Sequence, residues 1–70
     1  MKNQRQLIME HLEKFGSITP IEALQEYGIM RLASRICELR QMGANIQDET
    51  MFYTNRIGQH KHYSRYYFGE

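Results

Sequence analysis

The chain contains one cysteine, one proline and no tryptophan in 70 residues. Because Cys37 is the only thiol, an internal disulfide is excluded, and so is a zinc site of the paired-cysteine type. Cys37 follows Ile36 in an apolar helical pattern. We therefore expect it to be a small buried side chain in a protein of a reducing compartment.

Long hydrophobic runs are also absent. No stretch approaches the roughly 18 apolar residues of a membrane-spanning helix. The N-terminal segment MKNQRQLIMEHLEKFG carries charge throughout and lacks the apolar region of a signal peptide. We therefore expect a cytoplasmic protein with no membrane partner.

The sequence lacks the residue sets that catalysis requires. There is no Ser/His/Asp arrangement, no glycine loop that would cradle a phosphate and no carboxylate cluster. His60 and His62 form an H-x-H pair, but no third metal ligand accompanies them in the sequence. We expect no enzymatic activity, no cofactor and no metal site.

A strong net charge is missing too, since the formal value is only +1. That value alone gives little support to the binding of a polyanion. The positive charge is concentrated near the C-terminus, where residues 51–70 hold Arg56, Lys61 and Arg65 against a single acid, Glu70. Such a segment is suited to phosphate groups.

Apolar residues at helical spacing predict three helices, at about residues 3–15, 20–27 and 30–42. A glycine follows each of them, as is common where a helix ends. The side chains that we expect to be buried are Leu7, Ile8, His11, Leu12 and Phe15 from the first helix, Ile21, Ala23, Leu24 and Tyr27 from the second, and Leu32, Ala33, Ile36, Cys37 and Leu39 from the third.

The second helix has a clear start signal. Thr19 is the expected N-cap, Pro20 fits the first helical position, and Glu22 completes a capping box. The segment Ser17–Thr19 before it is too short for an independent strand, but Ile18 could add one edge pairing to a sheet.

In the rest of the chain the apolar residues no longer recur at helical spacing. Residues 45–54 and 60–68 are rich in Thr, Tyr and Phe and flank the turn NRIGQ, which predicts a β-hairpin. We expect an inward face made of Ile46, Phe52, Ser64, Tyr66 and Phe68. Three helices followed by a two-stranded hairpin define the predicted fold, an α+β winged helix-turn-helix that occupies residues 1–70 as a single domain.

The run GSITPIEALQEYGIMRLASRICELRQMG, residues 16–43, closely resembles a family of small helix-turn-helix proteins of bacteriophages and prophages. The shared pattern is GSIT…EAL…G…RLA(A/S)RI…LR..G, followed by a hairpin that ends in an aromatic-rich strand. The hairpin of this chain is longer, and richer in Tyr and His, than the Lys/Arg-rich turn of the relatives. The resemblance implies a double-stranded DNA partner and a bacterial host cell.

In helix-turn-helix proteins the second helix of the motif enters the major groove. Arginine matches guanine O6 and N7, and serine can contact a phosphate or a base. The side chains that the third helix should turn outward are Arg31, Ser34, Arg35, Glu38 and Gln41. The same pattern is also typical of a solvated face with one ion pair, in which Glu38 orients an arginine. In the wing, Arg56 and Lys61 are the expected phosphate contacts.

Two functions remain open from the sequence. The first is a sequence-specific DNA-binding protein, acting as a small transcription regulator or recombination accessory factor, with a homodimer expected because one small domain covers few base pairs. The second is a protein-binding inhibitor of a host defence system, similar to anti-CRISPR proteins. Its contact surface would be an aromatic patch of Tyr53, Tyr63 and Tyr67, which could equally pack on one another or on a second copy.

Overall fold

The computed structural model describes residues 2–69, in which three helices are combined with a three-stranded antiparallel sheet. The strand order is β1-β3-β2. The elements are α1 (Gln4–Phe15), β1 (Ser17–Ile18), α2 (Pro20–Tyr27), α3 (Leu32–Gln41), β2 (Ile46–Thr54) and β3 (His60–Phe68). The α+β winged fold is confirmed, and the additional strand is the short segment whose edge pairing was anticipated: Ile18 lies opposite Tyr66 on β3.

Local capping determines where α1 and α2 begin. Asn3 and Gln6 form a capping box at the start of α1, and Thr19 and Glu22 form another at the start of α2. In the second box, the Glu22 carboxylate accepts hydrogen bonds from the Thr19 backbone N–H at 2.9 Å and from its hydroxyl at 3.0 Å. Gly28 ends α2 with a φ of 68°, a left-handed conformation that favours glycine.

Helix α3 begins at Leu32, two residues later than the spacing predicts. After Gly28, the backbone N–H of Ile29 returns to the carbonyl of Ala23 at 3.1 Å, and the Ile29 side chain is buried. Residues 29–31 are therefore a connection anchored in the core. Arg31 takes the N-cap position without a side-chain capping bond.

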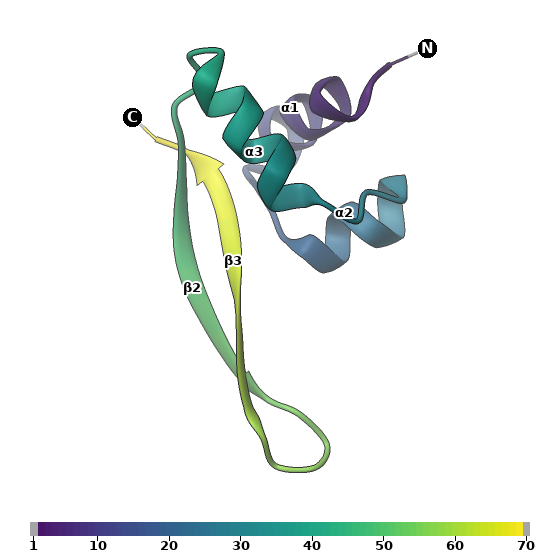
Figure 1. Cartoon of the computed structure of the whole chain (residues 1–70), viewed down its shortest axis with the longest axis vertical. Helices are drawn as coiled ribbons and strands as arrows, with labels where there is room; N and C mark the ends of the chain where they lie inside the picture. Colours follow the sequence, from purple (N-terminus) through teal and green to yellow (C-terminus); the bar gives the residue numbers. More distant parts are fainter. Residues whose placement is uncertain (1, 70) are drawn as a thin grey trace.

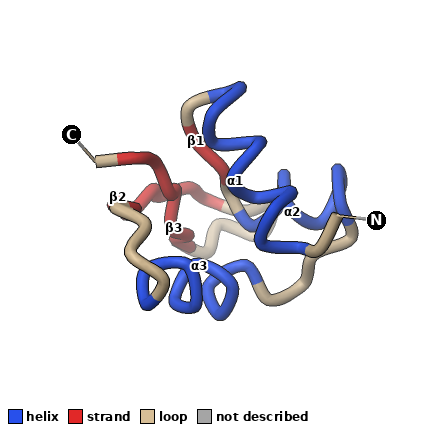
Figure 2. The backbone as a smooth tube through the Cα atoms, turned by 90° about the horizontal axis from the view of Figure 1, so that it is seen from above, coloured by secondary structure: helices blue, strands red, loops and turns tan. Residues whose placement is uncertain are grey.

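The hydrophobic core lies between the three helices and the open end of the hairpin. In the view from above, α1 and α3 lie on either side of the strands, with β1 next to α1 (Figure 2). The buried core side chains are Ile8, Leu12, Ile18, Ala23, Ile29, Leu32, Ile36, Leu39, Ile46 and Tyr66.

His11 and Tyr27 join α1 to α2. His11 is buried, and its Nδ1 shares a hydrogen bond of 2.7 Å with the Tyr27 hydroxyl. Burial raises the pKa of Tyr27, and the carboxylates of Glu26, Glu10 and Glu22 raise it further. The histidine is a structural one, since its ring packs edge-on against the tyrosine ring.

Helix α2 is rotated relative to the prediction. Ile21 and Leu24 are exposed, whereas Ala23 is fully buried. The small Ala23 side chain lets this short helix approach the core closely, and Ile29 from the following turn supplies the bulk that Leu24 was expected to supply.

The predicted buried face of α3 is also too wide. Leu32, Ile36 and Leu39 are buried, but Ala33 and Cys37 are exposed, so the expectation of a buried cysteine is wrong. One stripe at spacings of four and three residues is enough to cover the core side of a ten-residue helix. Phe15, the last residue of α1, is likewise exposed and lies under the Lys14 ammonium.

The hairpin extends well past the helices, and its turn projects away from them (Figure 1). Ile46 and Tyr66 lie at the end of the hairpin that the helices cover, and both are buried. Phe52 shares the phase of Ile46 but is 78% exposed, so its predicted inward role is wrong. It lies opposite His62, beyond the covered end, and the centroids of the two rings are 6.2 Å apart.

Candidate nucleic-acid interface

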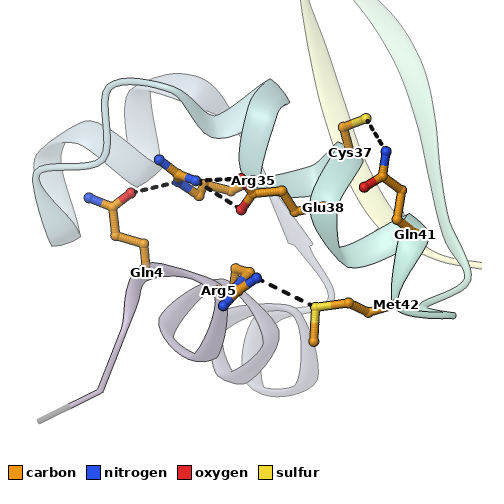
Figure 3. Close-up of polar contacts among 7 residues, drawn as sticks. All are labelled: Gln4, Arg5, Arg35, Cys37, Glu38, Gln41 and Met42. Carbon is orange, nitrogen blue, oxygen red and sulfur yellow. Dashed lines mark hydrogen bonds and ion pairs between the residues drawn. The ribbon is translucent and has the colours of Figure 1, made fainter.

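One side of α3 is free of contacts with the core and carries small or uncharged side chains. Ala33, Ser34, Cys37 and Gln41 are exposed on this side, at the spacings that bring helical residues together. The Gln41 amide lies 3.9 Å from the Cys37 sulfur, and both side chains point away from α1 (Figure 3). Small side chains let a helix backbone come close to a surface that it binds.

Arg31 stands at the N-terminal end of α3 and is exposed. It forms no ion pair with the residues that the structure describes. The unpaired N–H groups at a helix N-terminus favour negative charge, and an adjacent free guanidinium adds to that preference. This end of α3 is therefore suited to an anion.

Arg35 is not free in the way the sequence suggested. Its guanidinium donates to both Glu38 carboxylate oxygens, at 2.8 and 2.7 Å, and to the Gln4 side chain of α1 at 3.1 Å. Arg35 and Glu38 are each half-buried and lie on the side of α3 that faces α1 (Figure 3). The Arg35–Glu38 ion pair, which was the alternative to base contacts, is thus formed. The bond from Arg35 to Gln4 links α3 to the start of α1.

Arg40 has a structural role at the other end of α3. It donates to the Ile46 carbonyl at 2.9 Å and to the Asp48 carboxylate at 3.0 Å, and its guanidinium lies over the Tyr66 ring. These bonds fasten the helix to β2.

The hairpin carries two free cations. Arg56 and Lys61 are exposed and have no acidic partner within residues 2–69. Arg65 differs, since it is paired with Glu49 across the strands at 2.6 Å. Residues 50–69 contain no aspartate or glutamate, so the outer hairpin has a positive character.

A concave surface connects the start of α3 with the hairpin. Arg31 and Ser34 line it from the helix side, and Ser64 and Tyr66 line it from β3. A ligand that follows this surface would contact both the N-terminal half of α3 and the wing.

His60 and His62 project from the same face of β3. His60 Nδ1 lies 3.3 Å from the Thr54 hydroxyl, and the His62 ring packs near Phe52. In the part of the chain that is described, no three His, Cys, Asp or Glu side chains gather in a way that could hold a metal ion.

The three tyrosines of the aromatic patch are not one cluster. Tyr53 and Tyr63 pack against each other with ring centroids 5.9 Å apart, whereas Tyr67 lies under the Arg65 guanidinium. The tyrosine pair forms one wall of an apolar groove. Its other wall comes from α2 and the turn after it, and the lining residues there are Pro20, Ile21, Leu24, Ile29 and Met30. The sequence reading missed this groove because it assigned Ile21 and Leu24 to the core.

The chain has three helices, a β-hairpin after the last helix, one free cation at the start of that helix and two more on the hairpin. These are the features of a winged helix-turn-helix domain, a class in which the second helix of the motif meets DNA. A family model for the winged helix-turn-helix domain matches residues 3–70, and the chain belongs to this family. A comparison with curated proteins gives no match. None of the helices in the described part of the chain has the length and apolar character to cross a bilayer.

Proposed function

We propose that this chain is a sequence-specific double-stranded DNA-binding protein in which α3 enters the major groove and the hairpin follows the neighbouring backbone. One observation carries the proposal: Arg31, Arg56 and Lys61 are exposed cations with no acidic partner among residues 2–69, and they lie at the start of α3 and along the hairpin. Cations in those places would meet phosphates while α3 lies against base edges.

The exposed side of α3 supports direct readout by a few side chains. Arg31 can bind guanine in a bidentate way, Ser34 can contact a base or a phosphate, and the Ala33 methyl group suits a thymine methyl. Gln41 lies far enough along the helix to reach the backbone. In this proposal Arg35 and Glu38 act by holding α3 on α1, and they meet DNA only if their pair opens.

We further propose that the protein acts as a dimer, as a small transcription regulator or recombination accessory factor of phage or prophage origin. A single domain of this size contacts few base pairs, so useful discrimination between sites needs two copies or a neighbouring protein. The resemblance of residues 16–43 to phage proteins supports the origin.

Cys37 offers a direct test of the docking face, because it is the only cysteine and it lies exposed on the proposed DNA side of α3. We expect a bound duplex to slow the reaction of Cys37 with N-ethylmaleimide several-fold, and high salt to restore the free rate. A Cys37→Ser variant is the control for labelling elsewhere. Unchanged reactivity in a complex that demonstrably forms would refute the placement of α3 in the groove.

Alanine variants test the cations. The two phosphate contacts of Arg56 and Lys61 predict a slope of log affinity against log salt of about −2, and Lys61→Ala should reduce its magnitude by about one. Arg31→Ala should weaken binding and relax specificity. The matched controls are Lys14→Ala and Arg5→Ala on α1, which should leave affinity and slope unchanged. Equal effects in variants and controls would contradict the proposal.

The apolar groove favours a second candidate, a protein partner such as a component of a host defence system. The groove is lined without any charged side chain, which suits an apolar segment of a protein better than a phosphate backbone. Under this alternative the tyrosine pair and Leu24 are the anchors.

The two candidates make opposite predictions for one pair of variants. If a protein partner is the ligand, Leu24→Glu abolishes its capture while Arg31→Ala does not, and the chain shows no DNA binding at low salt. If DNA is the ligand, Arg31→Ala weakens binding and Leu24→Glu retains it. A chain that binds DNA with the behaviour described above excludes the second candidate as the main function.

A further inference from the structure

The turn of the hairpin has a defined geometry. The Asn55 backbone N–H donates to the Gln59 carbonyl at 3.0 Å, and the Gly58 N–H donates to the Asn55 carbonyl at 3.1 Å. Gly58 has a φ of 83°. This is a three-residue loop built from a type I turn and a left-handed glycine, and it places Arg56 and Ile57 at its two outermost positions.

The Asn55 side chain holds this turn rigid. Its carbonyl oxygen accepts from the backbone N–H of Ile57 at 3.2 Å and of Gln59 at 2.9 Å, and its amide donates to the Gln59 side chain at 3.1 Å. One side chain thus binds two backbone N–H groups of the loop, which stabilises the shape of the tip.

Ile57 is the outermost apolar side chain of the molecule's most distant loop. It is 78% exposed, and the turn projects away from the helical body, which leaves no core for it to join (Figure 1). A single exposed apolar residue is ordinary by itself. Here it stands on a rigid tip, directly after the free cation Arg56 and near Lys61, in a segment without acids.

We propose that Ile57 is a wedge that enters the minor groove and inserts between two base pairs, bending the duplex. This inference rests on the proposed DNA-binding function and adds to it a deformation of the DNA. Apolar side chains that unstack a base step and kink the duplex are an established way for proteins to use the minor groove.

The positive charge and the defined shape of the hairpin tip favour DNA as its ligand. Arg56 lies next to the wedge, where it reaches the phosphates that flank an opened step, and Lys61 follows on β3 to hold the backbone further along. The β-branched Ile57 has few rotamers, so little side-chain freedom is lost on insertion. Flexible pyrimidine–purine steps would open most easily, which gives the tip a preference without hydrogen bonds to bases.

The test uses the tightest duplex that the full chain selects from a randomised pool, labelled at both ends for energy transfer. We expect wild-type protein to bend it by an angle in the range of about 20–90°. Ile57→Ala should bind within about tenfold of wild type but lose most of the bend, whereas Ile57→Leu should keep it. Arg56→Gln should lower affinity and salt slope while the bound duplex still bends.

A fluorescent base analogue at the predicted step provides a second measurement, since unstacking raises its emission with wild type and not with Ile57→Ala. Urea unfolding should be the same for both proteins because the Ile57 side chain is 78% exposed. If Ile57→Ala bends the duplex as wild type does, or wild type binds without bending, the wedge is refuted while DNA binding stands. If wild type binds no duplex at low salt, both proposals fail.

Discussion

Arg31 and Arg35 show how far a residue's role depends on distant neighbours. Both are arginines four residues apart at the start of one helix, and the sequence assigned them the same task. The structure leaves Arg31 exposed and ties Arg35 to Glu38 and to Gln4 of α1. Glu38 could be anticipated from helical spacing. Gln4 could not, because it lies 31 positions away in the chain.

The Tyr27 hydroxyl gives a prediction at the scale of one residue. Because its pKa in the folded chain is raised above its ordinary value of about 10, folding favours the protonated phenol. The stabilisation is complete below about pH 10 and is lost as the pH rises through the folded-state value. We therefore expect the free energy of unfolding to fall in alkaline solution.

A Tyr27→Phe variant should decline less steeply above about pH 10. At neutral pH it should lose about 1–2 kcal/mol, because the hydrogen bond to the buried His11 is gone. Urea unfolding followed by circular dichroism at a series of pH values measures both effects, with Tyr67→Phe as the matched control. An identical alkaline slope in Tyr27→Phe and wild type would contradict the assignment.

At the scale of elements, the bounds of α2 followed from local chemistry, whereas the face that it buries did not. The capping box of Thr19 and Glu22 and the turn at Gly28 placed α2 correctly. The predicted rotation of α2 about its own axis was wrong, because Ala23 and Ile29 fill the space beside α1 and Leu24 stays exposed. Spacing alone cannot choose between two neighbouring stripes of a short helix when both contain apolar residues.

The hairpin gives a second prediction, for two residues that share a phase on β2. Ile46→Ala should cost about 2–4 kcal/mol because it opens a cavity in the core. Phe52→Ala should change stability by no more than about 0.5 kcal/mol because the ring is largely exposed. The urea concentrations at the unfolding midpoints of the two variants, compared with wild type, test both expectations. A large loss in Phe52→Ala would mean that the outer hairpin packs on the body.

The turn after β2 shows a signal that sequence reading could have used. Asn55 and Gly58 at the first and fourth positions of a turn are typical of a type I turn with a left-handed glycine. That pattern places Ile57 at the tip. Its exposure then follows, since a tip at the end of two nine-residue strands lies far from the core.

At the scale of the whole molecule, ion pairing decides which cations are free to meet a ligand. Arg35, Arg40 and Arg65 are neutralised by acids beside them. Among residues 2–69, five cations have no acidic partner: Arg5 and Lys14 on α1, Arg31 at the start of α3, and Arg56 and Lys61 on the hairpin. A net charge of +1 therefore does not show that α3 and the hairpin together carry three free cations.

The sequence by itself determined the order of the elements, their caps, the glycines that end the helices and the hairpin turn. These features depend on interactions between residues no more than about four positions apart, so the sequence itself contains them. Only the tertiary structure decided which arginines are free, which side of α2 is buried and how far the hairpin extends beyond the helices. Each of those outcomes depends on the shape and charge of segments that are distant in the chain and meet only after folding.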